Sequence, residues 1–243
     1  MKTPESEAWT MLTLVSRVDA GMREAVSSAM RWRPWEYRLY FDPVVLGDTS
    51  MAKKIVEDLH RRLSPETRLV LKDQAVTSCE DHHDDVVRAV HTAILESSLM
   101  KALWLDDDDL MLRNPSELLP LMSSDVGMVY GDVEQRFPNG SVMYQRGARE
   151  AMRGSVILYN RDALAKVYRN IDVWRPRQRD SPRDYGYFWD YKIAYWLRRY
   201  GYELRHHSQL LSVQNVNPNP GEKRRSLYQD WPLIVERMGG EKI

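Results

Sequence analysis

Cysteine is nearly absent from this sequence, which contains Cys79 alone. A single thiol cannot close an intrachain disulfide, and it excludes a zinc site built on several thiolates. Proteins without disulfides are typical of reducing compartments, so we expect a cytoplasmic protein. The first residues, MKTPESEAWT, contain no apolar segment of the kind that signal peptides carry. No run of about 18 apolar residues follows, and we therefore expect no membrane span.

An excess of charge of either sign is missing as well. Lys and Arg together number 35, as do Asp and Glu, so the formal net charge is zero. A neutral chain has no overall attraction to nucleic acid or to an anionic membrane. The 243 residues, 43% of them apolar, suffice for the core of an ordinary globular protein. These numbers do not predict an oligomeric state.

What is present is an alternation of two hydrophobic patterns. Short β-compatible runs predict strands at 11–16, 36–43, 67–73, 101–105, 126–132, 154–160 and 202–215, with a turn between extended pieces at 137–147. Amphipathic spacing predicts helices at 22–32, 49–64, 84–100, 116–122, 161–171 and 188–201. Alternating strands and helices in the first half predict a mostly parallel sheet with helices on both faces, the Rossmann-like α/β class. No linker or repeat divides the chain, so we expect one domain over residues 1–243.

Four consecutive aspartates, residues 106–109, follow the apolar strand predicted at 101–105. In a parallel α/β sheet, ligands bind outside the carboxyl ends of the strands, which is where this run falls. Adjacent carboxylates repel one another, and a divalent cation relieves that repulsion because Mg²⁺ and Mn²⁺ prefer oxygen ligands. Alternate residues of an extended segment share a face, so the metal pair is either Asp106 with Asp108 or Asp107 with Asp109. The alternative is a solvated acidic turn.

The segment KALWLDDDDLMLRNPSELL, residues 101–119, resembles the DxD segment of GT-A glycosyltransferases. It is most similar to the retaining family that includes glycogenin and the bacterial lipopolysaccharide galactosyltransferases. The match runs from Trp104 to Asp108 and then through Ser116-Glu117-Leu118. The resemblance implies a GT-A fold and Mn²⁺ or Mg²⁺ held by Asp106 and Asp108. It also implies a nucleotide-sugar donor, a UDP-sugar first of all, whose diphosphate bridges to the metal.

Other landmarks of that family occur in the same order along the chain. The resemblance implies that Arg88 assists the departing diphosphate and that Asp190, in FWDYK, lies near the anomeric carbon as a catalytic group. Donor contacts are implied at Ser16, Arg17, Asp19, Asp85, Asp107 and Lys223. The segment RGSVILYN, residues 153–160, is similar to the family's strand beside the sugar.

The family's C-terminal histidine ligand has no counterpart in SVQNVNPNPGEKRRS, residues 212–226. We expect an amide oxygen of Asn215, or of Asn217, to serve as the third metal ligand. His206 and His207 precede this segment, and because they alternate on a predicted strand only one of them can face the site.

The leading hypothesis is therefore a metal-dependent glycosyltransferase, and the resemblance implies retention of configuration. An inverting enzyme would use Asp184 or Asp190 as the base. The acceptor stays open among a glycan, a lipid, a protein and a modified DNA base. A nucleotidyltransferase is a rival, although its Gly-rich basic loop is poorly matched by SRVDAGMRE, residues 16–24. A non-catalytic cation- or sugar-binding module is the second rival.

The register of LWLDDDDLML also predicts how the four aspartates differ. Asp106 and Asp108 should be intolerant of substitution because they hold the metal. Asp107 and Asp109 should point the other way and tolerate change, one toward a helix terminus or the ribose and one toward solvent.

Overall fold

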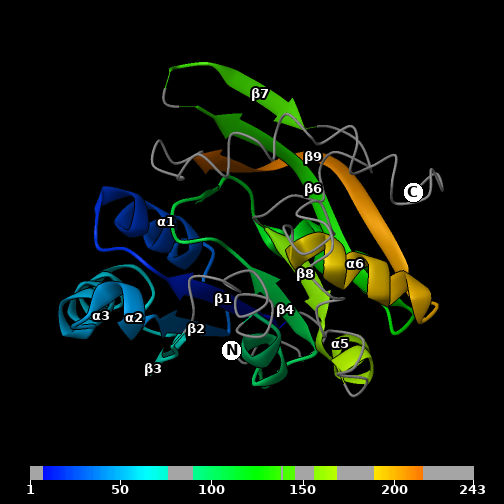
Figure 1. The fold of residues 1–243 in the computed structure, drawn as a ribbon, viewed down its shortest axis with the longest axis horizontal. Coiled ribbons are helices and arrows are strands. Elements are labelled where there is room, and N and C mark those ends of the chain that lie inside the picture. Colours follow the sequence, from blue (N-terminus) through cyan, green and yellow to red (C-terminus); the bar gives the residue numbers. More distant parts are fainter. Residues whose placement is uncertain (1–7, 76–89, 138, 146–155, 169–188, 216–243) are drawn as a thin grey trace, which may run out of the picture.

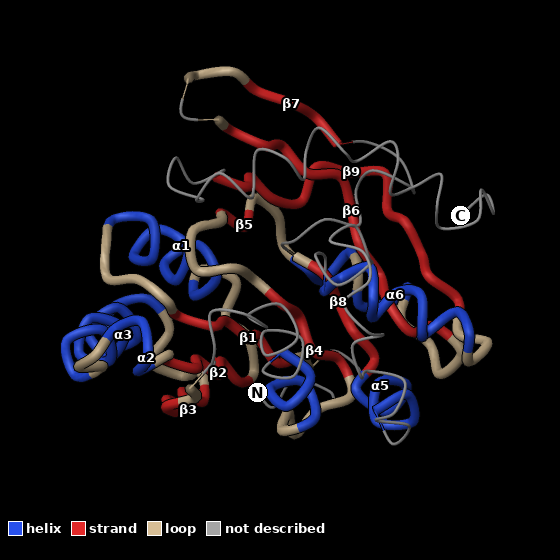
Figure 2. Tube along the Cα trace, in the orientation of Figure 1, coloured by secondary structure: helices blue, strands red, loops and turns tan. Residues whose placement is uncertain are grey.

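The computed structural model describes residues 8–75, 90–137, 139–145, 156–168 and 189–215 (Figure 1). One sheet runs through these residues. Its strands are β1 (Thr10–Val15), β2 (Glu36–Phe41), β3 (Arg68–Asp73), β4 (Lys101–Trp104), β5 (Leu110–Met111), β6 (Val126–Arg136), β7 (Val142–Gln145), β8 (Ile157–Asn160) and β9 (Glu203–Asn215). Their order is β3-β2-β1-β4-β8-β6-β9-β5, and β7 pairs with β6 (Figure 2).

The first half of the chain forms the parallel part of the sheet. Strands β2 and β4 flank β1 in parallel, and β3 is parallel to β2. Strand β8 runs antiparallel to both β4 and β6, whereas β9 is parallel to β6. Strands β1, β2, β3, β4, β6 and β9 therefore share one direction, and the predicted mostly parallel α/β class is confirmed.

The helices are α1 (Ala20–Met30), α2 (Pro43–Leu46), α3 (Ser50–Leu63), α5 (Arg161–Tyr168) and α6 (Trp189–Arg199). Asp19 begins α1, because its side chain accepts a hydrogen bond from the backbone N–H of Met22 at 3.0 Å. Residues 90–95 are also helical, so the helix predicted to reach residue 100 ends earlier. Among the described residues, no helix is long and apolar enough to cross a membrane.

The helix predicted at 116–122 is wrong in type. The chain instead forms two short 3₁₀ turns, η2 (Pro115–Glu117) and η3 (Leu119–Leu121). Proline provides no backbone N–H and restricts the residue before it, so Pro120 prevents one continuous α-helix here. The sequence analysis also missed α2 and β5, which are too short to show a hydrophobic period.

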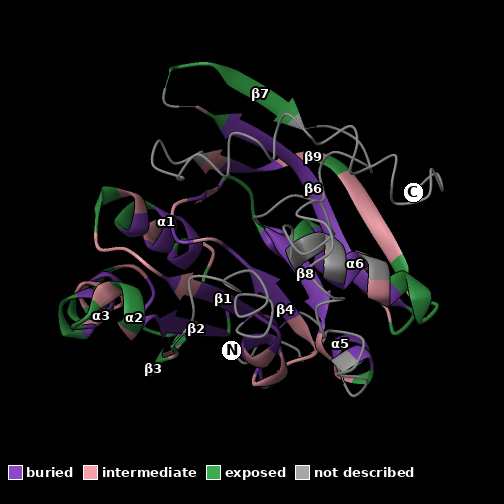
Figure 3. Ribbon diagram, in the orientation of Figure 1, coloured by how far each residue is buried: buried purple, intermediate pink, exposed green. Residues whose placement is uncertain are grey.

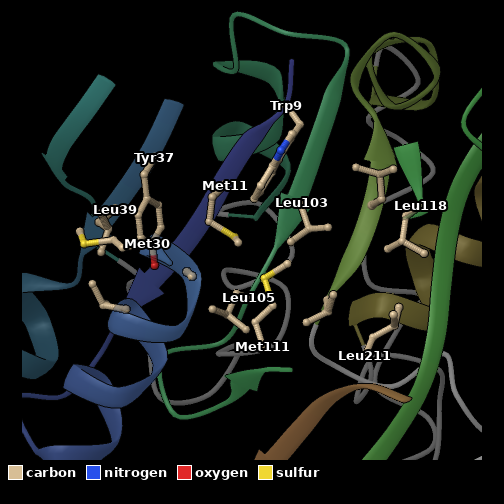
Figure 4. Close-up of a cluster of buried hydrophobic side chains, with 14 of the residues drawn as sticks. Trp9, Met11, Met30, Tyr37, Leu39, Leu103, Leu105, Met111, Leu118 and Leu211 are labelled. Atoms are coloured by element: carbon tan, nitrogen blue, oxygen red, sulfur yellow. The ribbon is translucent and has the colours of Figure 1, made fainter. Parts of the chain in front are cut away.

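Two hydrophobic clusters pack on the two faces of the sheet, and the strands β4 and β8 between them are largely buried (Figure 3). One cluster contains Met11, Leu103 and Leu211 together with apolar residues of α1 and α3 (Figure 4). The other contains Trp104 and Tyr130 together with apolar residues of 90–95, α5 and α6. Buried apolar side chains on both faces explain why the parallel strands appear in the sequence as nearly continuous apolar runs.

Candidate functional site

The strand order creates a switch point between β1 and β4. The chain moves from β1 outward to β2 and β3 and then returns to place β4 on the other side of β1. Leu105, just beyond β4, donates its backbone N–H to the carbonyl oxygen of Leu12 at 3.0 Å. The segments after β1 and β4 therefore leave the sheet side by side, and such crevices are where open α/β sheets bind ligands.

Ser16 joins these two segments through Asp107. One carboxylate oxygen of Asp107, Oδ2, accepts the backbone N–H of Ser16 at 2.6 Å and its hydroxyl at 2.9 Å. Asp107 is only 6% exposed. Burial raises the pKa of this carboxyl to about 7, and the hydrogen bonds from Ser16 oppose that rise. Asp107 thus fixes the position of the aspartate turn relative to β1.

Arg17 neutralises part of the acidic run. Its Nη2 lies 3.1 Å from Asp108 Oδ2, and its Nε lies 3.5 Å from Asp107 Oδ1. Its Nη1 lies 3.8 Å from Asp19 Oδ2, at the start of α1. A Cβ on Gly21 would lie 3.7 Å from the Cβ of Asp108, so α1 begins directly against the aspartates.

The four aspartates divide into two pairs by burial. Asp106 and Asp108 are partly exposed, whereas Asp107 and Asp109 are buried. Asp106 Oδ1 accepts the indole N–H of Trp104 at 2.7 Å, which holds this carboxylate at the carboxyl end of β4. The expectation that one of the other two points to solvent is wrong, because Asp109 is fully buried. It failed because β5, which was not predicted, draws the end of the run into the fold.

Strand β5 also brings the end of β9 to the aspartate turn. Leu110, directly after the run, pairs with Val213, and Met111 pairs with Ser212. Asn215 is the last residue of β9 and lies two positions beyond Val213. The backbone of Asn215 is therefore carried toward the aspartates from a distant part of the sequence.

The remaining predicted site residues are placed only in part. Asp190 belongs to the first turn of α6 (Trp189–Arg199). Asp85, Arg88, Asp184, Asn217 and Lys223 lie outside the described residues. The structure therefore gathers Ser16, Arg17, Asp19, Asp106, Asp107 and Asp108 and does not test the others.

His206 and His207 face opposite sides of β9, as predicted. His206 Nε2 lies 2.7 Å from Asp132 Oδ1, and its ring lies 5.5 Å from that of Tyr130. His207 Nε2 lies 3.6 Å from Glu117 Oε2. Asp132 was not predicted as a site residue, although it follows directly on the apolar run of β6, VGMVYG, as the aspartate run follows that of β4.

Backbone strain occurs beside the aspartates. Val156 has a φ of 60°, a left-handed value that is rare for a β-branched residue. Its N–H donates to the carbonyl oxygen of Trp104 at 2.9 Å, and its side chain is buried. Strained residues persist where the surrounding structure fixes them and are frequent at ligand sites.

The oxygen-rich edge suits a hard divalent cation. Asp106 and Asp108 provide two partly exposed carboxylates, and Mg²⁺ or Mn²⁺ usually takes one or two from a protein and completes its shell with water and phosphate. Among the described residues, no group of three His, Cys, Asp or Glu side chains is arranged to hold a metal.

Comparison with other proteins shows similarity in structure alone. No protein-family model and no curated protein sequence matches the chain. A mannosyltransferase from Pyrobaculum calidifontis, PcManGT, solved with GDP-Man and Mn²⁺, superposes with a TM-score of 0.62 at 14% identity, over 97% of this chain and 65% of its own. S. aureus TarS 1–349, also solved with UDP, gives a TM-score of 0.58 at 11% identity, over 94% of this chain and 64% of its own.

A third similar structure is a putative glucose-1-phosphate thymidylyltransferase from Bacillus anthracis, with a TM-score of 0.52 and 10% identity over 83% of this chain and 87% of its own. The chain spans slightly less than two thirds of TarS 1–349 and PcManGT. At identities of 14% or less these similarities show a shared fold, and the expected GT-A fold is confirmed.

Proposed function

We propose that this protein is a metal-dependent glycosyltransferase that moves a sugar from a nucleotide-sugar donor to a hydroxyl-bearing acceptor. The observation that supports it best is the meeting of two predicted sets of residues at the β1/β4 switch point. Ser16, Arg17 and Asp19 come from one strand end, and Asp106 and Asp108 come from the other. We also propose that residues 1–243 form one catalytic domain and that the protein is cytoplasmic.

In this proposal each group at the edge has a separate task. Asp106 and Asp108 hold Mn²⁺ or Mg²⁺, and Asn215 is the third protein ligand. When bound, the cation supplies charge neutralisation for the departing nucleoside diphosphate. Asp107 holds the aspartate turn on β1 through Ser16 and so keeps the two ligands in register. Arg17, whose Nη2 lies 3.1 Å from Asp108 Oδ2, provides a cation for the donor phosphates.

Residues outside the described parts complete the proposed donor site. Arg88 and Lys223 contact the diphosphate, and Asp85 contacts the sugar. Asp190, in the first turn of α6, orients the acceptor or accepts its proton. The similarity of residues 101–119 to the glycogenin family supports retention, and the anomeric configuration of the product by NMR decides between retention and inversion.

The donor is a UDP-sugar in the first instance, because of that same similarity. PcManGT was solved with GDP-Man and TarS with UDP, so both nucleotides belong in the test. We would incubate the protein with Mn²⁺ and a panel of UDP- and GDP-sugars and measure nucleotide release and sugar transfer. Asp108→Ala should abolish both donor binding and turnover, and retention of both by this variant would refute the proposal.

A nucleotidyltransferase is the second candidate, because the similar thymidylyltransferase shares the fold. Such an enzyme joins a sugar 1-phosphate to a nucleoside triphosphate and releases pyrophosphate. The segment after β1, residues 16–24, contains one glycine, Gly21 in the first turn of α1, where a triphosphate-binding loop would be rich in glycine. Pyrophosphate release from a sugar 1-phosphate and a triphosphate, without release of nucleotide from sugar nucleotides, would favour this second candidate. Binding of donors without turnover would favour a non-catalytic module.

A further inference from the structure

One row of residues crosses four strands of the sheet and ends at His206. Trp104 in β4 pairs with Ile157 in β8. Leu158 of β8 pairs with Val129 of β6, so the next step of this antiparallel register sets Ile157 opposite Tyr130. Tyr130 in turn pairs with His206 in β9. Trp104, Ile157 and Tyr130 belong to the same hydrophobic cluster, so the row lies on one face of the sheet.

Two carboxylates lie just beyond this row, one after β4 and one in β6. Asp106 lies two residues past Trp104 and accepts its indole N–H at 2.7 Å. Asp132 lies two residues past Tyr130 and contacts His206 Nε2 at 2.7 Å. Strands β4 and β6 are separated only by β8, and adjacent strands lie about 4.8 Å apart. The backbone positions that carry them are thus separated by two strand spacings, on the order of 10 Å, and both follow residues of the same face of the sheet.

The imidazole of His206 has one nitrogen occupied and one available. A carboxylate only accepts hydrogen bonds, so Asp132 favours the tautomer with the proton on Nε2. Among the described residues, no hydrogen bond is formed by Nδ1, and the side chain of His206 keeps 15% of its surface exposed. In the neutral ring Nδ1 is therefore an acceptor of hydrogen bonds, and the contact with Asp132 fixes the ring in a position suited to a hydroxyl group.

Helix α6 covers this face of the sheet. A Cβ on Gly127, near the start of β6, would lie 2.9 Å from Leu197 Cδ2, close to the end of the helix. Strand β9 starts at Glu203, near Val126, so α6 ends at the start of β6 and begins further along that strand. In Figure 1 the beginning of α6, whose first turn contains Asp190, lies beside β8 and the middle of β6.

We infer that Asp132 and His206 form the acceptor-binding pair of the proposed glycosyltransferase, with His206 Nδ1 accepting a hydrogen bond from a hydroxyl of a neutral sugar or polyol. The inference rests on the proposed function, and it narrows the acceptor to a neutral polyhydroxylated compound. Glu134, two residues beyond Asp132, is only 9% exposed, and its Oε1 lies 2.7 Å from Arg136 Nε, so its charge is balanced within β6. The carboxylate of Asp132 beside the imidazole disfavours a phosphate or carboxylate on the acceptor.

His207 provides a matched control. It is the same residue type on the same strand, one position away, and it faces Glu117 on the other side of the sheet. A purely structural role for histidines in β9 would make His206→Gln and His207→Gln similar in effect. An acceptor role makes only His206→Gln and Asp132→Asn defective in acceptor binding.

The test uses the full chain and three neutral probes, the methyl glycosides of glucose, mannose and galactose. Their binding is followed by saturation-transfer NMR with and without Mn²⁺ and UDP, and the dissociation constants of Mn²⁺ and UDP are measured by calorimetry. The wild type and His207→Gln should bind at least one glycoside. His206→Gln and Asp132→Asn should weaken that binding about tenfold or more, with unchanged melting temperature and with Mn²⁺ and UDP affinities within about twofold of wild type.

Three results would overturn the inference. The wild type binds none of the glycosides, or His206→Gln binds them as well as wild type, or His206→Gln loses Mn²⁺ affinity, which would make His206 a metal ligand. Failure of the proposed function itself has a different signature, because the wild type then binds neither UDP- nor GDP-sugars in the presence of Mn²⁺.

Discussion

Asp107 receives two hydrogen bonds from Ser16, the backbone N–H at 2.6 Å and the hydroxyl at 2.9 Å, both on the same carboxylate oxygen. These two residues are 91 positions apart in the sequence, and they connect the carboxyl ends of β1 and β4. The acidic run is therefore part of the frame of the switch point as well as its surface. Its aspartates Asp107 and Asp109 are buried, and the contact of Asp107 with Ser16 has a structural role that a solvated acidic turn would not have.

This connection predicts different outcomes for two substitutions of Asp107. Asp107→Asn keeps an oxygen that accepts from Ser16, and because burial raises the pKa of Asp107 to about 7, the neutral amide resembles the protonated carboxyl. Asp107→Ala leaves both Ser16 donors without this acceptor and should cost about 1–3 kcal/mol of unfolding free energy. Urea unfolding of the metal-free protein at pH 7 measures the difference.

Ser16→Ala is the companion variant, since it removes the hydroxyl and keeps the backbone N–H. It should lose less stability than Asp107→Ala. Equal stability of Asp107→Ala and wild type would show that the connection contributes nothing, and it would restore the earlier expectation that Asp107 tolerates any change.

The ion pair between Arg17 and Asp108 predicts that removing the positive charge of Arg17 raises the affinity of the protein for Mn²⁺. The guanidinium lies 3.1 Å from Asp108 Oδ2, an oxygen that a cation in the proposed site would use. In the absence of donor, Mn²⁺ has to compete with Arg17 for this carboxylate. Arg17→Ala should therefore tighten Mn²⁺ binding to the donor-free protein by roughly threefold to tenfold, or about 1 kcal/mol. Manganese EPR titration measures free and bound ion directly.

Arg23→Ala is the control for net charge, because Arg23 is exposed on α1. It should leave Mn²⁺ affinity close to that of wild type. The same Arg17→Ala protein should bind UDP more weakly, since a phosphate contact is lost. If Arg17→Ala weakens Mn²⁺ binding in the absence of nucleotide, the competition does not exist.

Local patterns were enough to predict most elements of the fold. The six strands predicted between residues 11 and 160 each coincide with a strand of the structure, because each contains a short run of apolar or β-compatible residues. The position of Asp106 and Asp108 at a strand end followed from the apolar run KALWL before them. The parallel class followed from the alternation of helices and strands in the first half.

Long-range pairing was the part that sequence patterns could not predict. Asp109 is buried because the two-residue strand β5 pairs with β9, more than 100 positions away. No local period marks a strand of two residues. The contact of Asp132 with His206 likewise depends on the register of β6 and β9, which a single sequence does not contain. The position of Asp132 after an apolar strand was the one local signal available.

The β6–β9 register gives a prediction about Gly131. A Cβ at this position would lie 2.2 Å from Leu211 Cδ1 and 2.4 Å from its Cγ, so β9 packs directly on the glycine. Gly131→Ala should cost about 1–3 kcal/mol of unfolding free energy through overpacking. Leu211→Ala relieves part of the clash, so Gly131→Ala should cost less in that background, with a coupling of about 0.5–3 kcal/mol. A double-mutant cycle by urea unfolding measures this coupling.

The backbone carbonyl oxygen of Gln209 lies 2.9 Å from the same Cβ position, so the double variant should not recover fully. Because Gly131 precedes Asp132, the single variant should also weaken binding of the methyl glycosides. Additive costs in the cycle would mean that Leu211 does not set the packing at Gly131.

His91 predicts a loss of stability in mild acid. It is 1% exposed in the helical residues 90–95, and burial lowers its pKa from 6.5 to about 3. The unfolded chain takes up a proton below about pH 6.5, while the folded protein does not until far lower pH. Folding is therefore disfavoured as pH falls through this window, by about 1.4 kcal/mol per pH unit. Below the folded pKa the loss stops growing, because both states are then protonated.

Asp107 acts in the opposite sense, since a raised carboxyl pKa makes the folded state bind a proton first as pH falls from about 7. The measurement is therefore the difference between wild type and His91→Leu in urea unfolding at pH 7 and pH 5. Wild type should lose about 2 kcal/mol more than His91→Leu over this interval. Parallel curves for wild type and His91→Leu would mean that His91 does not stay neutral in the folded protein.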